Sequence, residues 1–173
     1  MRTHTKLHER RTTVQSTAVI AHDLHGFGFC EESPNLSTPE DFVESICEFT
    51  KTLNIERLIL VGHSAGGIVA ANVALRLEDR VNGLVLVEGP VGRKSRIVKF
   101  PILLIFGERD SDMGGLPRLE VATAQLEVIY SAELRFIENE RHNPMLENPA
   151  KFYNTLREFA EKKLHLLMKN VPT

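Results

Sequence analysis

The sequence predicts a single α/β domain with a doubly wound, mainly parallel sheet of about five strands. Three observations support this fold class. Short apolar runs rich in β-branched residues recur along the chain, helical patterns fall between them, and the runs are continuously hydrophobic rather than alternating. Continuous hydrophobicity is typical of parallel strands buried on both faces, and alternation of strands with helices is typical of a doubly wound sheet.

Five segments are predicted to form the strands. Each is an apolar run bounded by polar or turn-forming residues, as expected of strands in a compact domain. The connection between the third and fourth of them is unusual because it is short and has little helical pattern. The segments are "TAVIAHD" (17–23), "RLILVG" (57–62), "GLVLVE" (83–88), "PILLIFG" (101–107) and "ELRFIE" (133–138).

Four segments between and after these strands are predicted to form helices. The first follows a Thr38 cap with Pro39 in its first turn, a combination that favours a helix start. The second is apolar nearly all round, which indicates a helix packed deep against the sheet. The third pattern is weaker, and the fourth places Phe152, Leu156 and Phe159 on one face. The four ranges are 39–53, 65–77, 116–128 and 149–168.

The composition favours a small globular protein. The 173 residues are 42% hydrophobic, which is enough to give one domain a core. The net charge is -2 with acidic and basic residues intermixed, so we expect no nucleic-acid partner. Cys30 and Cys47 match neither a zinc site nor a disulfide framework, which favours a reducing, intracellular location.

No apolar run approaches the roughly 20 residues that cross a bilayer, and the first residues lack the apolar core of a signal peptide. We therefore expect a cytoplasmic protein without a membrane span. The start of the chain is basic and rich in Thr, so a mitochondrial presequence is the alternative. Residues 1–16 are predicted to be a flexible tail, 17–168 a single domain, and 169–173 a second tail.

The segment "LILVGHSAGG" carries the strongest functional pattern. It places Gly62-His63-Ser64-Ala65-Gly66 between a predicted strand and a predicted helix, which is the setting of a G-x-S-x-G nucleophile elbow. In such a turn the serine takes a strained conformation, and small flanking residues let helix and strand approach closely. The Ala65 amide would face an oxyanion at the positive end of the helix. A phosphate-binding loop is disfavoured because no Lys follows the glycines.

A serine nucleophile needs a base, and the base needs an orienting acid. "LLIFGERDSD" puts Asp110 just past a predicted strand, and "ENERHNPMLENP" puts His142 in the loop after the last strand. Ser64, Asp110 and His142 stand in the chain order expected when the nucleophile lies on a strand-to-helix elbow. Glu88, which ends the strand after the elbow helix, and Asp112 remain alternative acids.

The other candidate residues are given no chemical role. The remaining histidines, including His63 beside the nucleophile, are interpreted as packing or surface groups. Cys47 lies on the apolar side of a predicted helix and is expected in the core. No constellation of metal ligands is visible, and no metal or other cofactor is expected.

These motifs resemble the α/β-hydrolase superfamily. "GHSAGG", "GERD" and "RHNPMLENP" are similar to its nucleophile, acid and histidine segments, and "AHDLHGFGFC" to its D-x-x-G-x-G-x-S turn, with Cys30 where Ser or Thr is common. The resemblance covers roughly residues 17–165 and implies a nucleophile at Ser64, an acid at Asp110 and a base at His142. The short segment "VGRKSRIVK" at the usual cap site resembles that of members without a cap domain.

The stretch "VIAHDLHGFGFC" is interpreted as the fourth strand of that fold and the turn after it. About 38 residues separate Gly26 from Ser64, and one strand-helix-strand unit needs about 30 or more. The interval therefore holds one unit, and the family's first three strands would have to fit into residues 1–16, which are too polar and short. We expect an N-terminally truncated domain that lacks the turn supplying the second oxyanion amide.

Two functions are compatible with this pattern. The first is a serine hydrolase acting on a small-molecule ester, thioester or similar acyl substrate, with activity weakened by the missing oxyanion donor. The second is a non-catalytic relative that binds a ligand or protein partner. Because the predicted strand at 17–23 lacks its usual neighbour, it either moves beside the next strand or leaves an exposed edge through which a homodimer forms.

Overall fold

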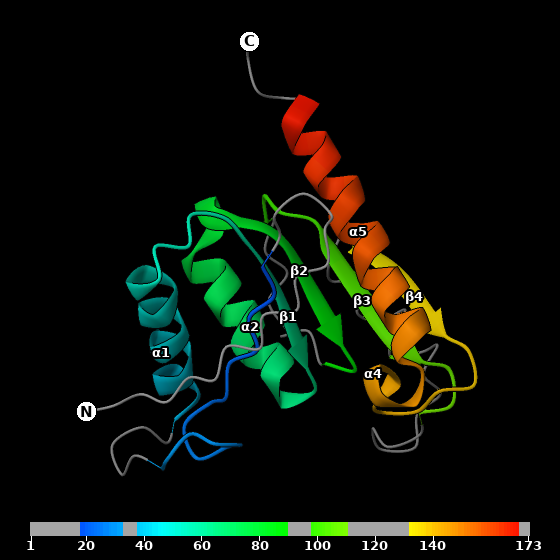
Figure 1. The fold of residues 1–173 in the computed structure, drawn as a ribbon, viewed down its shortest axis with the longest axis horizontal. Helices are drawn as coiled ribbons and strands as arrows, with labels where there is room; N and C mark the ends of the chain where they lie inside the picture. Colours follow the sequence, from blue (N-terminus) through cyan, green and yellow to red (C-terminus); the bar gives the residue numbers. More distant parts are fainter. Residues whose placement is uncertain (1–17, 33–37, 90–97, 111–131, 170–173) are drawn as a thin grey trace.

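The computed structural model describes residues 18–32, 38–89, 98–110 and 132–169, with side chains as far as Lys162. The four strands form one parallel sheet in the order β1-β2-β3-β4, with helices on both faces (Figure 1). This arrangement confirms the predicted α/β class. In chain order the elements are α1 (Pro39–Thr52), β1 (Leu58–His63), α2 (Ala65–Arg76), the 3-10 helix η1 (Glu78–Arg80), β2 (Val81–Val87), β3 (Ile102–Gly107), β4 (Ala132–Ile137), α4 (Pro144–Glu147) and α5 (Pro149–Lys169).

The carboxyl ends of the four strands lie at the same edge of the sheet. His63 is paired with Val87, Val87 with Ile105, and Gly107 with Ile137. Because every strand points the same way, the chain leaves each of them at this edge. The residues that follow the strands, which include the candidates for chemistry, are thereby brought close together.

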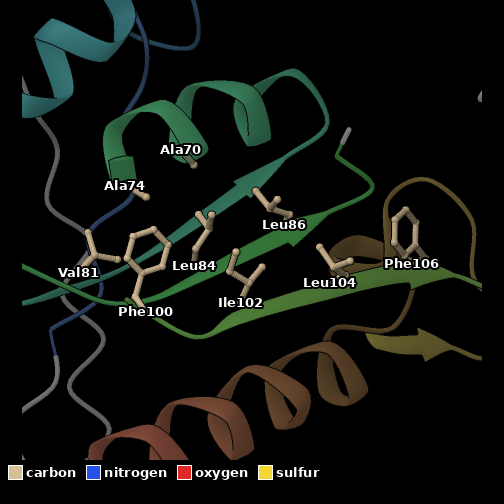
Figure 2. Packing of buried hydrophobic residues seen from close by; sticks show 9 residues of the cluster. All are labelled: Ala70, Ala74, Val81, Leu84, Leu86, Phe100, Ile102, Leu104 and Phe106. Carbon is tan, nitrogen blue, oxygen red and sulfur yellow. The ribbon is translucent and has the colours of Figure 1, made fainter. Parts of the chain in front are cut away.

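The two central strands, β2 and β3, are almost entirely buried because both faces of the sheet are covered there. Leu84 and Leu86 of β2 pack in the cluster beneath α2, whereas Val85 and Val87 pack in the cluster beneath α5, which includes Phe159. Figure 2 shows the α2 side, where small residues of the helix face large side chains of the sheet. The prediction of strands buried on both faces is confirmed for β2 and β3, whereas the edge strands β1 and β4 are only partly buried.

The helix α1 packs mainly on α2, through Val43 against Val69 and Val73. Its start follows the predicted cap at Thr38. The Thr38 hydroxyl accepts from the Asp41 N–H at 3.2 Å, and the Asp41 carboxylate accepts from the Thr38 N–H at 2.8 Å. This reciprocal pair satisfies two backbone donors at the helix start.

The strand predicted at 17–23 is not a strand in the structure. Residues 18–23, the described part of it, belong to no sheet, so the described sheet has four strands rather than about five. The His22 ring packs edge-on against Phe49 of α1 with the centroids 4.6 Å apart, and Leu24 joins the contact between α1 and α2. These side chains hold the segment against the helices, and an apolar run without a hydrogen-bonded neighbour does not form a strand.

The remaining predicted strands and helices are confirmed to within about two residues at their ends. The helix predicted at 116–128 and the alternative acid Asp112 lie outside the described residues. Among the helices that the structure describes, none combines the length and apolar character needed to span a membrane.

Stability should decrease in acid partly because of His22. Burial lowers the pKa of His22, and the nearby His25 lowers it further. Its Nδ1 atom is buried without a hydrogen-bond partner among the described residues. The unfolded chain therefore binds a proton at this residue more readily, so the stabilising contribution of neutral His22 is lost as pH falls below about 6.5.

We expect the fall in melting temperature between about pH 7 and pH 5 to be smaller in His22→Phe than in the unaltered protein. Circular dichroism melts at both pH values measure the fall in melting temperature of each protein. Because each fall is taken within one protein, a difference in stability between the two proteins at neutral pH does not affect the comparison. Equal falls in the two proteins would rule out this contribution.

Candidate active site

Ser64 occupies the turn between β1 and α2 with a strained backbone. Its φ of 50° and ψ of -123° lie outside the regions that non-glycine residues favour. The Ser64 N–H donates to the Val87 carbonyl of β2 at 2.9 Å, and the Gly67 N–H donates to the Ser64 carbonyl at 2.9 Å. Bonds to both the sheet and the helix hold the residue in this conformation, which is the condition under which such strain persists.

The two glycines of the elbow pattern have different environments. A Cβ atom on Gly62 would lie 2.5 Å from the Gly66 carbonyl oxygen and 2.7 Å from the Ala70 Cβ atom. A Cβ atom on Gly66 would meet nothing within 4 Å. Close approach of β1 and α2 therefore requires glycine at position 62, whereas position 66 has room for a side chain.

Asp110 and His142 are brought together at the carboxyl edge of the sheet. The His142 Nδ1 atom lies 2.8 Å from the Asp110 Oδ2 atom. The Asp110 side chain is fully buried, and that of His142 is 25% exposed. Since an ionised carboxylate only accepts hydrogen bonds, Nδ1 carries the hydrogen and Nε2 is the basic nitrogen of the neutral ring. This is the geometry of a base held by an orienting acid.

Glu88, one of the alternative acids, is buried beside this pair. It is 1% exposed with a φ of 49°, and its Oε1 atom accepts a hydrogen bond from the Gly107 N–H. Glu88, Asp110 and His142 offer potential metal-ligand atoms within 4.8 Å of one another. The hydrogen bond to the Nδ1 atom of His142 is made by Asp110, so the arrangement is that of an acid and a base with a second carboxyl group next to them.

Ser64 and His142 are at the same edge of the sheet but are not hydrogen-bonded. In the part of the chain that the structure describes, the Ser64 hydroxyl makes no hydrogen bond to the imidazole. Such contacts are often long in ligand-free enzymes and tighten when substrate binds. Ala65 is exposed and is the first residue of α2, so its N–H has no partner within the helix and is available to an oxyanion.

His63 contacts His142 directly, which the sequence interpretation did not anticipate. The His63 Nε2 atom lies 2.7 Å from the His142 carbonyl oxygen. The two rings have centroids 5.0 Å apart and are tilted by 58°. One signal was present in the sequence: His63 ends the strand that leads to the nucleophile, so it lies at the edge where the loop after β4 also ends.

A cavity of about 240 Å³ between the sheet and α5 is lined by none of the candidate site residues. Its charged walls include Glu133, Arg135 and Lys162. Glu133 forms ion pairs with both of the other two, at 3.4 Å with Lys162. Glu158 is the fourth charged residue of the lining, so two acidic and two basic side chains leave the cavity without a net charge to attract an ionic ligand.

Comparison with known proteins identifies the family of the chain. The sequence model of the family described as "alpha/beta hydrolase fold" matches residues 14–165, which is most of the chain. The chain belongs to the alpha/beta hydrolase fold family. The resemblance inferred from the motifs is thus confirmed. The matched residues include Ser64, Asp110 and His142.

Two curated relatives match shorter stretches of the hydrolase-fold chain. The 1-acylglycerol-3-phosphate O-acyltransferase ABHD5 of Homo sapiens is 43% identical over 74 residues, 40% of this chain and 21% of that protein. The (Lyso)-N-acylphosphatidylethanolamine lipase of Homo sapiens is 39% identical over 70 residues, 38% of this chain and 20% of that protein. The matched stretch thus spans about a fifth of the length of these relatives.

A solved structure shares the fold over a larger part of the chain. The crystal structure of a "predicted CIB-like hydrolase" from Thermoplasma acidophilum superposes with a TM-score of 0.71 at 21% sequence identity. The superposition covers 81% of this chain and 70% of that chain. It therefore supports the hydrolase fold over most of the described elements.

Alanine at the two elbow glycines should have different effects on stability. Gly62→Ala forces β1 away from α2, and we expect it to lower the free energy of unfolding by about 1–3 kcal/mol. Gly66→Ala, the matched control, has open space and a helical position, and we expect unchanged or slightly higher stability. Urea denaturation measures both variants, and equal destabilisation by the two substitutions would contradict the packing account.

Proposed function

We propose that this chain is a serine hydrolase that acts on an ester, thioester or similar acyl group. The observation that carries the proposal is the 2.8 Å hydrogen bond between His142 Nδ1 and Asp110 Oδ2, at the sheet edge where Ser64 occupies its elbow. A base oriented by a buried acid, together with an exposed helix start, is the set of groups that acyl transfer through a serine requires.

In the proposed reaction the Nε2 atom of His142 takes the proton of the Ser64 hydroxyl as Oγ attacks the acyl carbonyl carbon. The Ala65 N–H donates to the resulting oxyanion at the positive end of α2. The imidazolium then gives its proton to the leaving group, and an acyl-enzyme remains on Ser64. Water, activated by the same imidazole, hydrolyses the acyl-enzyme and restores the free serine. Asp110 stabilises the imidazolium throughout.

The substrate class is proposed from the chemistry of the site and from the relatives. Their names refer to an acylglycerol phosphate and to an N-acylphosphatidylethanolamine, both of which carry acyl groups on lipids. An acyl lipid is therefore the first class of natural substrate to test. Short p-nitrophenyl esters serve as reporters of the chemical step because they need few binding contacts.

A second candidate function is a non-catalytic module that binds a ligand or a second copy of the chain. Two observations favour it. Ser64 is not hydrogen-bonded to His142 among the described contacts, and β1 has a sheet neighbour on one side only in the described sheet, with Val61 50% exposed. An open strand edge is a site for pairing with another chain. Sedimentation that shows a dimer, in a protein without esterase turnover, would favour this candidate.

The decisive test of the hydrolase proposal is labelling of Ser64. We expect a fluorophosphonate probe to attach to Ser64 and p-nitrophenyl butyrate to be hydrolysed, because the neutral imidazole of His142 can take the serine proton. Intact-mass and peptide mass spectrometry identify the labelled residue. Ser64→Ala is the control, since it removes one oxygen atom and leaves the acid and base in place.

If Ser64→Ala is labelled as strongly as the unaltered protein, the probe reports another nucleophile and the proposal is wrong. Absence of labelling in a well-folded, unaltered protein would likewise reject catalysis at Ser64. Turnover that is measurable but slow agrees with the proposal, because the proposed mechanism names a single oxyanion donor, the Ala65 N–H, and one such donor typically contributes about 10²- to 10³-fold in rate.

The roles of the two buried acids can be separated by isosteric amides. Asp110→Asn removes the acceptor that fixes the tautomer of His142, and we expect the esterase rate to fall about 10⁴-fold. Glu88→Gln keeps an oxygen that can accept from the Gly107 N–H, and we expect less than about a 10-fold change. Steady-state kinetics on both variants provide the comparison. A larger loss in Glu88→Gln than in Asp110→Asn would make Glu88 the orienting acid.

A further inference from the structure

His63 forms a direct link between the strand that leads to the nucleophile and the loop that carries the base. Its Nε2 atom lies 2.7 Å from the carbonyl oxygen of His142, and its ring lies beside the His142 ring with the centroids 5.0 Å apart. The two residues are far apart in the sequence and come from opposite edges of the described sheet. This contact therefore crosses the whole carboxyl edge of the sheet.

The hydrogen bond has a defined direction. A carbonyl oxygen only accepts, so His63 Nε2 must carry the hydrogen and donate it. Both side chains are partly buried, and a hydrogen bond shielded from water in this way holds its partners more firmly than an exposed one. Because His63 binds the carbonyl oxygen of His142, it does not bind the nitrogens of the His142 ring. Nδ1 remains bonded to Asp110, and Nε2 remains available as a base.

The backbone of the His142 loop is also held locally: the Arg109 N–H donates to the Glu140 carbonyl, and the Arg141 N–H donates to the Glu147 carboxylate. These bonds tie the loop to neighbouring segments, whereas the His63 bond ties it to the strand that leads to Ser64. Asp110 fixes the His142 ring at one atom, which leaves the backbone of the loop to be held by other contacts. His63 is covalently next to Ser64 and is the last residue of β1. A bond from His63 to the His142 backbone thus couples the position of the base to that of the nucleophile.

We propose that His63 is a positioning residue that sets the separation of Ser64 and His142 by holding the His142 carbonyl group. The catalytic consequence rests on the proposed hydrolase function. Misplacement of reacting groups by about 1 Å can cost about 100-fold in rate. Because His63 would set the separation of the nucleophile and the base, its loss should lower the rate of the chemical step more than the affinity for substrate.

The first test measures the position of the loop without relying on activity. His63→Phe keeps an aromatic ring and removes the donor, whereas His63→Gln places an amide N–H near the former Nε2 atom. Hydrogen-deuterium exchange of a peptide that spans 138–147 should be faster in His63→Phe by about fivefold, as expected for loss of one hydrogen bond. Exchange in His63→Gln should remain close to that of the unaltered protein.

The second test measures the catalytic consequence with p-nitrophenyl butyrate. We expect kcat to fall about 10- to 100-fold in His63→Phe with KM nearly unchanged, and His63→Gln to recover most of kcat. His22→Phe, the same replacement at a histidine that packs on α1, is the control and should leave kcat unaltered. Circular dichroism melts show whether each variant is folded at the assay temperature.

The outcomes separate this proposal from the hydrolase proposal. Unchanged exchange of 138–147 in folded His63→Phe would overturn the positioning role, whatever the activity. Faster exchange in a protein whose Ser64 never reacts with a fluorophosphonate would keep the positioning role and reject the hydrolase function. Equal loss of kcat in His63→Gln and His63→Phe would also overturn the proposal, because it would assign the effect to the imidazole ring rather than to the donated hydrogen bond.

Discussion

The parallel direction of the four strands is the constraint on which the rest of the structure depends. Each strand pairs with its neighbour in parallel register, so the chain leaves β1, β2, β3 and β4 at one edge. Ser64, Glu88, Asp110 and His142 all follow strands, and that shared edge gathers them although they are widely spaced in the sequence. Parallel strands must be joined by crossovers on the faces of the sheet, and α2 is the crossover between β1 and β2 that covers one face. The helix α5, which follows β4, packs on the other face.

The electrostatic environment at this edge follows from the burial of its two carboxyl groups. Asp110 has no side-chain exposure and Glu88 has almost none, so two carboxyl groups share an environment poorly supplied with water. Each has a polar contact: Asp110 is bonded to the His142 ring, and Glu88 accepts from the backbone of β3. A carboxylate that accepts the Nδ1 hydrogen fixes the tautomer and the orientation of the imidazole. The proposed hydrolase chemistry uses this pair, and the His63 contact holds the backbone of the same histidine.

The sequence predicted most of the elements because their signals are local. The Thr38 cap, the apolar α2 segment and the continuously hydrophobic strands depend on neighbouring residues, and the structure agrees with them. The segment at 17–23 was predicted wrongly because an apolar run becomes a strand only when another strand pairs with it, and His22 packs on α1 instead. The role of His63 was missed for a related reason, since its partner lies in a loop far along the chain.

The sequence by itself determined the fold family, the order of the candidate nucleophile, acid and base, and the elbow in which Ser64 lies. Residue type, spacing and hydrophobic periodicity encode these features, and all of them act over short stretches of chain. Only the tertiary structure decided that Asp110, rather than Glu88, makes the hydrogen bond to the His142 ring, and that glycine is required at position 62 but not at 66. These features depend on distances between separate strands and helices, which are fixed only when the sheet and its covering helices pack together.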